Sequence, residues 1–404
     1  MNRYRQEIPR KWWSPALSPF WLRVWRPMRR RTTRRKQQII EVRVRGQEHL
    51  LSAVSEGCGV MIAPNHSGHA DAHILYDAAD QIGTPCYFLT AWQVFDQVGW
   101  LAQQILRHHG CFSIDREGTD LRAFKQALEI LREREHPLVV FPEGEVYHLN
   151  DRITPFREGA AAIALSAAKK SPRQIMVVPC AIKYEYAEDP TPQLLELMDR
   201  LEDAIHWRPR PELSLPERIY KFAEGALALK EIEKLGSTGS GGVKERLAKL
   251  LDGVLDQLEH RYGFDHSARG VPERVKELRR AILTRLAELR GEDEEGNAAH
   301  DVPPNDPHRR QLESDLDDVF LVVQLYSYPG DYVRENPTIE RIAETLDKFE
   351  EDVLRVFSAT VRAQRRATVL FGEPIPVEAG RKREAARELT RQMEQAVQGL
   401  LDSI

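Results

Sequence analysis

A histidine and an aspartate separated by four residues are the pair in this chain whose types and spacing best suit acid–base chemistry. His66 and Asp71 follow an apolar run at residues 60–63, across a turn that contains Pro64 and Gly68. An imidazole that takes a proton from an alcohol needs a partner that holds one tautomer and stabilises the cation. Asp71 is close enough in the chain to be that partner, so the pair predicts a general base with an orienting carboxylate.

Two later segments carry side chains suited to binding. Arg116 follows a predicted strand at residues 111–114, and a guanidinium at a strand end of an open α/β sheet can bind a phosphate. A further predicted strand at 138–141 enters a tight turn at Glu143 and Gly144. Each feature also has an ordinary interpretation when taken alone: a helix-capping aspartate, a surface ion pair and a turn with solvated acids.

The elements that would position these residues alternate between short apolar runs and amphipathic stretches, which is typical of an α/β domain. The predicted strands are 39–44, 60–63, 86–89, 111–114, 138–141, 175–182 and, near the C-terminus, 368–371. The predicted helices are 72–82, 95–108, 121–134, 160–169 and 382–401. The predicted fold class is therefore α/β, a mixed sheet covered by helices, with a large helical insertion.

Composition divides the chain into four parts. Residues 1–38 are basic and rich in tryptophan, 39–189 form the predicted core, 190–366 are charged and helix-prone, and 367–404 return to the core as a closing strand and helix. Segment 190–366 contains a Gly/Ser joint at 236–242 and a polar stretch at 291–308. We interpret it as an insertion whose ends lie close together at the edge of the sheet. It would cap a substrate groove of the core, restrict what binds there, contact a partner or merely add stability.

The net charge of −4 hides an uneven distribution. Residues 9–40 contain ten Lys or Arg and no acid, so the rest of the chain sums to −14 (−4 minus 10). The same window holds Trp12, Trp13, Trp21 and Trp25, four of the seven tryptophans. Indole rings favour the lipid headgroup region, and basic tracts favour anionic lipid. A nucleic-acid-binding tail or a targeting segment would leave the tryptophans unexplained, so we predict an anionic membrane surface as partner and no nucleic acid.

Several classes of protein are disfavoured. No apolar run reaches the roughly eighteen residues of a spanning helix, and the N-terminus lacks the pattern of a secretory signal. The predicted location is cytoplasmic, peripheral on the inner face of the membrane. Four cysteines without metal-ligand spacing are expected to be reduced core thiols: Cys58, Cys86, Cys111 and Cys180.

In their order along the chain, these segments resemble the blocks of the glycerolipid acyltransferase family, whose typical member is 1-acylglycerol-3-phosphate acyltransferase. The resemblance covers residues 40–184, and 368–401 look like the family's closing strand and helix. The matching residues are Asn65, His66 and Asp71 for the His-x4-Asp block, Gly110 to Arg116 for the second block, Phe141 to Gly144 for Phe-Pro-Glu-Gly, Val177 to Ala181 for the fourth block, and Pro155 to Ala160 for the connection between the last two.

The resemblance implies transfer of an acyl group from a coenzyme A or acyl-carrier-protein thioester to a lysolipid hydroxyl. His66 would be the general base and Asp71 its orienting partner. Substrate would be bound by Asn65, Arg116, Glu143 and Gly144. No metal and no cofactor beyond the acyl-CoA or acyl carrier protein co-substrate is implied. Because a thioester is already activated, the enzyme mainly needs positioning, a base and stabilisation of the oxyanion.

One departure from the family concerns the acceptor. Members often continue Phe-Pro-Glu-Gly with Thr-Arg-Ser, whereas this chain has Glu145, Val146 and Tyr147. A positive charge is replaced by an apolar residue and a carboxylate is added. An acceptor with less phosphate charge than lysophosphatidate, or with an amine, therefore suits the site better.

Two alternatives to acyl transfer remain open. The cluster His66, His69, Asp71 and His73 could hold a divalent metal, as in a metal-dependent hydrolase, but no distant His and carboxylate set stands out to complete such a site. The chain could also be a catalytically silent lipid-binding protein that keeps the fold.

Overall fold

The computed structural model describes residues 11–116, 120–264, 270–291, 302–356, 358–378 and 383–404. Within these residues the chain divides into two compact units. One comprises Trp12–Pro192 with Thr360–Ile404, and the other is built from Gln193–Ala359. Three predicted features fall partly outside the described residues: the start of the membrane-surface segment at 1–10, most of the polar stretch 291–308, and the first residue of the closing helix at 382.

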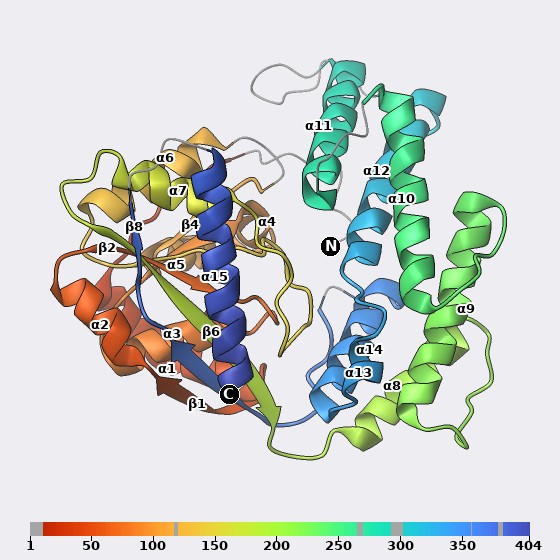
Figure 1. Ribbon diagram of the computed structural model, residues 1–404, viewed down its shortest axis with the longest axis horizontal. Helices are drawn as coiled ribbons and strands as arrows, with labels where there is room; N and C mark the ends of the chain where they lie inside the picture. The colour runs from red at the N-terminus through yellow and green to blue at the C-terminus, as the bar shows by residue number, and fades with distance from the viewer. Residues whose placement is uncertain (1–10, 117–119, 265–269, 292–301, 357, 379–382) are drawn as a thin grey trace. The chain divides into compact units, whose positions relative to one another are not determined.

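The first unit is an α/β fold around a mixed sheet (Figure 1), in which eight strands are described. The strands are β1 (Ile39–Arg45), β2 (Gly59–Pro64), β3 (Tyr87–Ala91), β4 (Cys111–Ile114), β5 (Leu138–Val139), β6 (Ile175–Tyr186), β7 (Arg365–Phe371) and β8 (Ile375–Val377). Their order across the sheet is β1-β7-β6-β2-β5-β3-β4, and β8 pairs with β6. The predicted α/β class with a mixed sheet is confirmed.

The direction of the strands decides where loops can meet. β2 is parallel to both β5 and β6, and β3 is parallel to both β4 and β5. β7 is antiparallel to β6, and β1 is parallel to β7. The carboxyl ends of β2, β4 and β5 therefore lie at the same side of the sheet, which is where ligands bind in open α/β folds.

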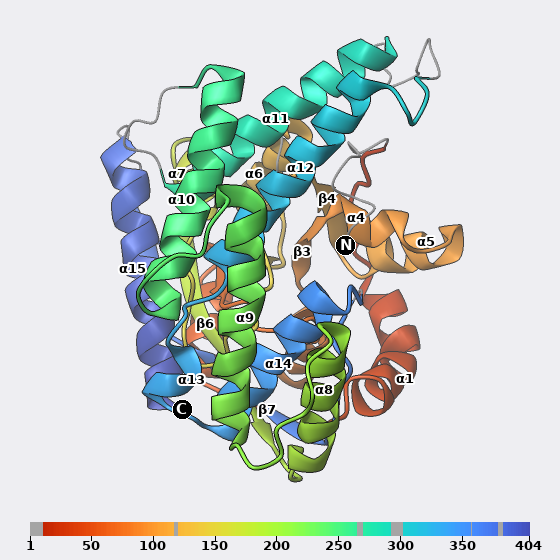
Figure 2. The ribbon, with the colours of Figure 1, turned by 90° about the vertical axis from the view of Figure 1, so that its right-hand side faces the viewer.

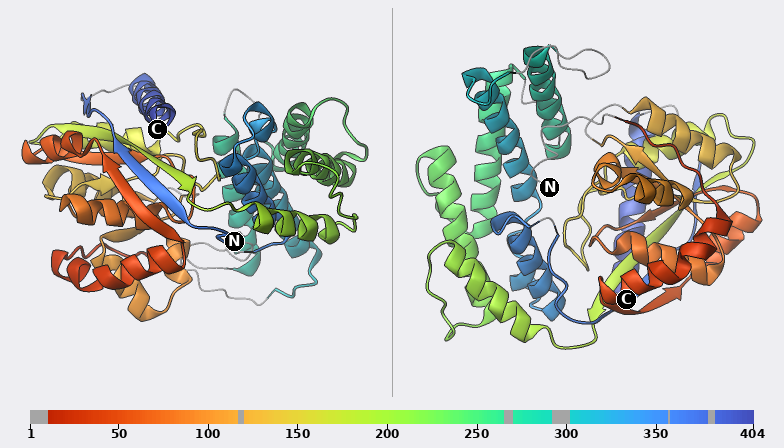
Figure 3. Two further views of the ribbon diagram at one scale, coloured as in Figure 1. Left: turned by 90° about the horizontal axis from the view of Figure 1, so that it is seen from below. Right: turned by 180° about the vertical axis from the view of Figure 1, so that it is seen from behind.

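Helices cover both faces of this sheet. They are α1 (Pro19–Arg35), α2 (Gln47–Ser55), α3 (Asp71–Ile82), α4 (Trp92–Asp96), α5 (Trp100–His108), α6 (Leu121–Glu133), α7 (Gly159–Ala168) and α15 (Arg383–Ser403). α6, α7 and α15 share a hydrophobic core on one face. α1 and α3 pack on the other, so that α15 and α1 lie on opposite sides of the sheet (Figure 3, left).

The closing helix α15 has one apolar side, which packs into the core. Leu389, Met393, Val397 and Leu401 recur every four residues in α15 and are all buried. This spacing lines one side of a helix, and burying each such side chain contributes about 1.5–3 kcal/mol. α15 packs mainly on β6. The neighbouring strand β2 is buried along its whole length, as expected for a strand covered on both faces.

Some predicted elements differ from the structure. The helix predicted at 95–108 is two helices, α4 and α5, because Gly99 adopts an extended conformation (φ −68°, ψ 164°) at the start of α5. The strand predicted at 138–141 ends at Val139, since the chain turns away before Pro142. The sequence interpretation missed α1, α2 and β8. None of the described helices is long and apolar enough to cross a bilayer.

The second unit is helical. Its described helices are α8 (Thr191–Ala204), α9 (Leu215–Leu235), α10 (Val243–Tyr262), α11 (Val271–Arg290), α12 (Pro307–Tyr326), α13 (Tyr332–Glu335) and α14 (Ile339–Val353). α9 to α12 enclose one apolar core, and α10 and α12 lie side by side (Figure 2). The buried Asp315 carboxylate accepts hydrogen bonds from Arg261, Tyr262 (2.7 Å) and Gln311 (2.9 Å), so its charge is compensated inside that core.

The chain leaves the sheet and returns to it at neighbouring strands. Tyr186 at the end of β6 pairs with Arg365 at the start of β7. Beyond them the amide of Ala187 donates to the carbonyl of Gln364 (2.8 Å). The two ends of the helical segment therefore lie side by side, between interior strands rather than at a lateral edge of the sheet.

This connection predicts that the helical segment can be removed. Replacing residues 190–360 with a short Gly/Ser linker should leave the sheet folded, because the linker only has to join an antiparallel strand pair. Circular dichroism and thermal unfolding of the shortened chain test this, and loss of a cooperative transition would contradict it. If acyl transfer and acceptor choice are both unchanged in the shortened chain, the helical segment is not part of the active site.

Candidate active site

Three loops that follow parallel strands bring the predicted residues together. β2 leads to His66, β4 to Arg116, and β5 to Glu143 and Gly144. Contacts join these loops directly: the amide of His66 donates to Glu143 Oε1 (2.7 Å), and Arg116 donates to the carbonyl of Gly144. Residues separated by up to 78 positions in the chain (144 minus 66) thus share one end of the sheet.

The His66–Asp71 pair has the geometry that the sequence predicts. His66 Nδ1 lies 2.8 Å from Asp71 Oδ2, with the histidine side chain 21% exposed and the aspartate fully buried. The imidazole stacks on the ring of Phe141 at a centroid distance of 4.1 Å. Since Nδ1 is hydrogen-bonded to the carboxylate, Nε2 is the ring nitrogen that can accept a proton.

The Asp71 carboxylate is held by three donors. Oδ2 accepts from the amide of Gly68 (3.0 Å) as well as from His66, and Oδ1 accepts from the hydroxyl of Tyr184 (2.5 Å). Asp71 is also the first residue of α3, where the helix dipole stabilises a negative charge. These donors compensate a buried carboxylate and fix its orientation.

Glu143 holds the histidine loop through the backbone. Its Oε1 accepts from the amide of His66 (2.7 Å), and its Oε2 accepts from the amide (3.1 Å) and the hydroxyl of Thr154. The side chain is 2% exposed, and burial raises the pKa of Glu143, which these hydrogen bonds only partly offset. Sequence reasoning predicts Glu143 as a substrate-binding residue; in the structure both of its oxygens bind protein groups.

Asn65 is likewise engaged by the backbone. Its amide oxygen accepts from the amide of Ile182 (2.7 Å), and its nitrogen donates to the carbonyl of the same residue (3.0 Å). Asn150 makes the same pair of bonds with Tyr184, both at 2.7 Å. β6 extends past the end of β2, and these two amides satisfy the backbone groups that a neighbouring strand would otherwise pair.

Gly144 and two arginines form the polar end of the site. Gly144 has a φ of +77°, and a Cβ there would lie 2.7 Å from Arg157 Nε, so the turn needs glycine. Arg116 donates to the Gly144 carbonyl and forms an ion pair with Glu145 (2.9 Å). Two guanidinium groups therefore flank the turn, and one carboxylate offsets part of their charge.

Four residues of this site escaped the sequence interpretation as functional positions. They are Phe141 under the imidazole, Asn150 and Tyr184 at β6, and Thr154 beside Glu143. Tyr184 lies beyond the predicted strand 175–182, and no local pattern marks it as a partner of Asp71. Arg157 was included in the family resemblance but without a role.

The proposed metal cluster does not form. Across the described parts of the chain, no three of His66, His69, Asp71 and His73 bring ligand atoms to within metal-binding distance of one another. Burial and the nearby cations of Arg29 and Lys36 lower the pKa of His73.

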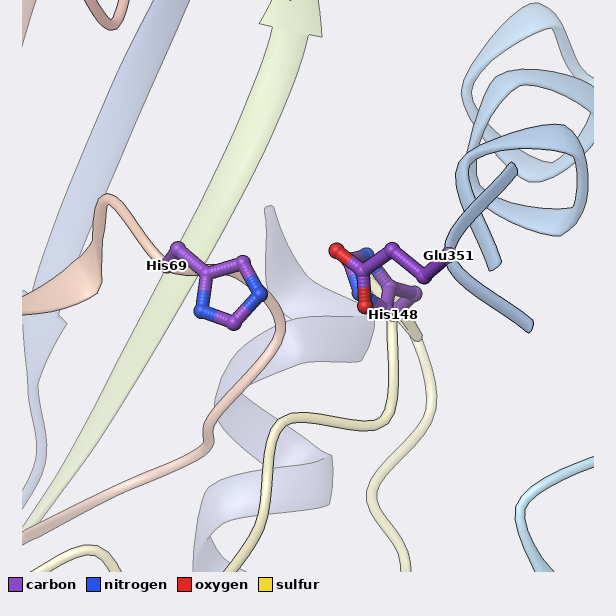
Figure 4. A group of neighbouring side chains, drawn as sticks. All are labelled: His69, His148 and Glu351. Carbon is purple, nitrogen blue, oxygen red and sulfur yellow. The ribbon is translucent and has the colours of Figure 1, made fainter. Parts of the chain in front are cut away.

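His69 instead lies beside His148. The two rings are 5.7 Å apart and roughly perpendicular (Figure 4). Glu351, also drawn in Figure 4, belongs to the second unit, where its carboxylate accepts from the amide of Ala359 (2.9 Å).

Comparison with known families identifies this part of the chain. The family model described as Acyltransferase matches residues 41–183, which include β2, β4, β5 and every predicted site residue from Asn65 to Gly144. A search of curated proteins finds no match. Residues 41–183 are therefore an acyltransferase domain, in agreement with the predicted resemblance to the glycerolipid acyltransferase family.

Proposed function

We propose that the enzyme transfers a fatty-acyl group from acyl-CoA or acyl carrier protein to a hydroxyl of a lysophospholipid-type acceptor at the inner surface of the membrane. The observation that carries this proposal is the His66–Asp71 hydrogen bond (2.8 Å) at the carboxyl ends of parallel strands within an acyltransferase domain. His66 is the general base in this proposal, and Asp71 orients it.

The reaction needs one base and no covalent enzyme intermediate. His66 Nε2 takes the proton of the acceptor hydroxyl while its oxygen forms a bond to the thioester carbonyl carbon. The carbonyl electron pair moves to oxygen, and its return breaks the C–S bond. The leaving thiolate takes the proton from the imidazolium, which Asp71 has stabilised in the meantime. The products are an ester and a free thiol.

The polar end of the site favours an acceptor with a single negative charge. Arg116 and Arg157 flank Gly144, but Glu145 pairs with Arg116 at 2.9 Å. Glu145 therefore offsets the charge of Arg116 that would otherwise face the acceptor headgroup. A phosphodiester headgroup, or one that carries an amine near Glu145, suits this balance better than a dianionic phosphate monoester.

Arg116 should affect acceptor binding more than donor binding. Replacing Arg116 with alanine should raise the KM for the acceptor about tenfold, because a charge-assisted hydrogen bond is lost. Lysine should restore it only partly, since it lacks the planar fork of donors. Steady-state kinetics with each substrate varied in turn measure both constants, and an unchanged acceptor KM would place the headgroup elsewhere.

Glu145→Gln is the matched variant, and it should strengthen the positive charge at the acceptor site where Arg116→Ala weakens it. It leaves Arg116 in place but removes the charge that offsets it. The ratio of kcat/KM for a lysophosphatidate to that for a phosphodiester lysolipid should rise about two- to fivefold, the effect of a partly exposed ion pair.

Helix α1 supports docking on an anionic bilayer. Phe20, Val24 and Met28 recur every four residues on it and are 64%, 48% and 46% exposed. Arg34 and Arg35 at its last turn are exposed as well. An exposed apolar stripe next to basic residues is the pattern of a helix that lies in the membrane interface.

Some basic residues of the N-terminal segment form ion pairs within the protein. Arg26 and Arg29 pair with Asp80 of α3, and Arg30 pairs with Asp77. These ion pairs fasten α1 to the domain and use three of the positive charges. Trp13 is buried and stacks on Phe95 at 5.1 Å, so this indole is part of the core rather than available to lipid.

A second apolar patch lies on α5. Trp100 and Leu101 at its first turn are 71% and 62% exposed. The other end of α5 contacts the start of α1, where the amide of Ser18 donates to the carbonyl of His108 (3.1 Å). We propose that α5 contributes these two side chains to the same interface.

Liposome sedimentation tests the docking proposal. Arg34→Gln with Arg35→Gln should weaken binding to anionic vesicles about tenfold or more at low salt, since each basic residue near the surface contributes about 1 kcal/mol. Lys169→Gln with Lys170→Gln, at the end of α7 on the other face of the sheet, is the matched control and should bind like the wild type. Equal binding by both double variants would contradict a role for α1.

The function itself is tested with substrates. The purified full-length protein is incubated with radiolabelled acyl-CoA or acyl carrier protein and a panel of lysolipids that differ in headgroup, and the labelled product is identified. An acylated lysolipid supports the proposal. Binding of lysolipid without transfer would indicate a catalytically silent lipid-binding protein instead.

A further inference from the structure

We propose that Tyr184 is a positioning residue of the acyl-transfer site, whose hydroxyl fixes the Asp71 carboxylate and weakens its hold on a protonated His66. The inference rests on the proposed role of His66 as the base. It adds a third member, from β6, to a pair that the sequence locates only in the loop after β2.

The geometry assigns the Tyr184 hydroxyl to Asp71. It lies 2.5 Å from Asp71 Oδ1, while His66 and the Gly68 amide occupy Oδ2. Tyrosine and aspartate are 6% and 0% exposed, so water does not compete for this bond. Each oxygen of the carboxylate therefore has its own partner, and the carboxylate cannot rotate without breaking a buried hydrogen bond.

The position of the Tyr184 hydroxyl is fixed by the backbone that carries it. Its backbone pairs with Ala367 of β7 on one side and with the Asn150 amide on the other. The guanidinium of Arg365 lies 5.0 Å from the centre of its ring. A donor on a strand that is fixed on both sides is preorganised, which is what the orientation of a catalytic base requires.

The phenol acts only as a donor. Burial, with the charge and hydrogen bond of Asp71, raises the pKa of Tyr184 well above its ordinary value. The hydroxyl therefore keeps its proton in any practical assay, and its hydrogen bond draws negative charge from Asp71. A carboxylate with less charge stabilises an imidazolium less, so the Tyr184 hydrogen bond favours return of the proton from His66 to the leaving thiolate.

Three other titratable or charged groups lie near His66, Asp71 and Tyr184, and they do not account for a difference between the Tyr184 variants and the wild type. Glu143 contacts His66 through the backbone amide, the Cys180 thiol has a pKa raised by burial and by Asp71, and Arg365 lies over the tyrosine ring. All three are unchanged in variants of residue 184, so their contributions cancel between those variants and the wild type.

The test is the pH dependence of kcat/KM for acyl transfer by the full-length enzyme. Tyr184→Phe should move the acid limb to higher pH by about 0.5 unit or more and lower the plateau about tenfold through the less constrained carboxylate. Site-specific 3-fluorotyrosine at 184 keeps the shape and strengthens the donor, so it should move the acid limb to lower pH. This second variant keeps the test valid if Tyr184→Phe does not fold.

Tyr76→Phe is the matched control, because Tyr76 is a partly buried tyrosine of this unit, and its hydroxyl donates to the His109 carbonyl (2.9 Å). It should leave the acid limb in place. An acid limb and a His66 imidazole NMR titration that both stay unmoved in the two Tyr184 variants would overturn the inference. A moved NMR titration with an unmoved rate profile would support the role of Tyr184 and count against His66 as the base.

Discussion

Replacing His66 with alanine should lower kcat by about 10²- to 10⁴-fold, the usual contribution of a general base. The side chain is 21% exposed and the loop is held through the His66 backbone by Glu143 and Tyr147, so the fold should survive the change. Single-turnover transfer from labelled acyl-CoA measures the rate, and thermal unfolding confirms that the variant is folded. Turnover close to the wild type would remove the proposed mechanism.

Asp71→Asn should also lower kcat, because it changes the group that orients His66. The amide of asparagine can turn its nitrogen toward His66 Nδ1 and select the wrong tautomer, so a large loss is expected although the volume is unchanged. His49→Ala, on α2 and outside the site, is the control for replacement of a histidine and should retain full activity. A normal rate in Asp71→Asn would show that the carboxylate does not orient the base.

Glu143→Gln should cause the largest loss of stability among single changes at the site, about 2–3 kcal/mol of unfolding free energy. A glutamine keeps one acceptor, for either the His66 amide or Thr154, and turns a donor toward the other amide. The histidine loop then shifts, and kcat should fall about tenfold or more. Glu158→Gln, in a surface ion pair with Arg387, is the matched control and should be nearly neutral.

The stability difference between wild type and Glu143→Gln should depend on pH. Burial raises the pKa of Glu143 in the folded state above its value of 4.5 in the unfolded chain. With a raised pKa, protonated Glu143 adds to the unfolding free energy of the wild type. This contribution is fully present below pH 4.5 and is lost as the pH rises through the folded-state pKa. The variant lacks this titration, so the difference should narrow over that window. Urea unfolding at several pH values measures it, and a difference that widens with pH would contradict the assignment.

Local patterns were sufficient to predict most of the first unit. Apolar runs bounded by turn residues placed β2, β4 and β6, and periodic apolar residues placed α3, α6 and α15. The His-x4-Asp spacing located the His66–Asp71 pair because both residues lie in one loop and the first turn of one helix. Information of this kind is contained in a few consecutive residues.

Contacts between distant segments could not be predicted in this way. Tyr184 lies 113 residues from Asp71, and Asn65 meets Ile182 across 117; nothing local marks either pairing. Glu143 was predicted to bind substrate, because its hydrogen bonds to the His66 amide and to Thr154 join residues 77 and 11 positions apart and leave no local pattern. The partners of Arg26, Arg29 and Arg30 lie on α3, so charge counting alone overestimated the cations available to lipid.

The strand order also has a consequence for the chain during synthesis. Among the described strands, β1 pairs only with β7, and β7 begins at Arg365, 320 residues after β1 ends at Arg45 (365 minus 45). On the ribosome the first strand must therefore wait for nearly the whole chain, while the helical segment emerges earlier and can fold as a unit. Because closing so long a loop is slow, we expect nascent chains to expose the β6 edge until residues 365–371 emerge, and to bind chaperones over that interval.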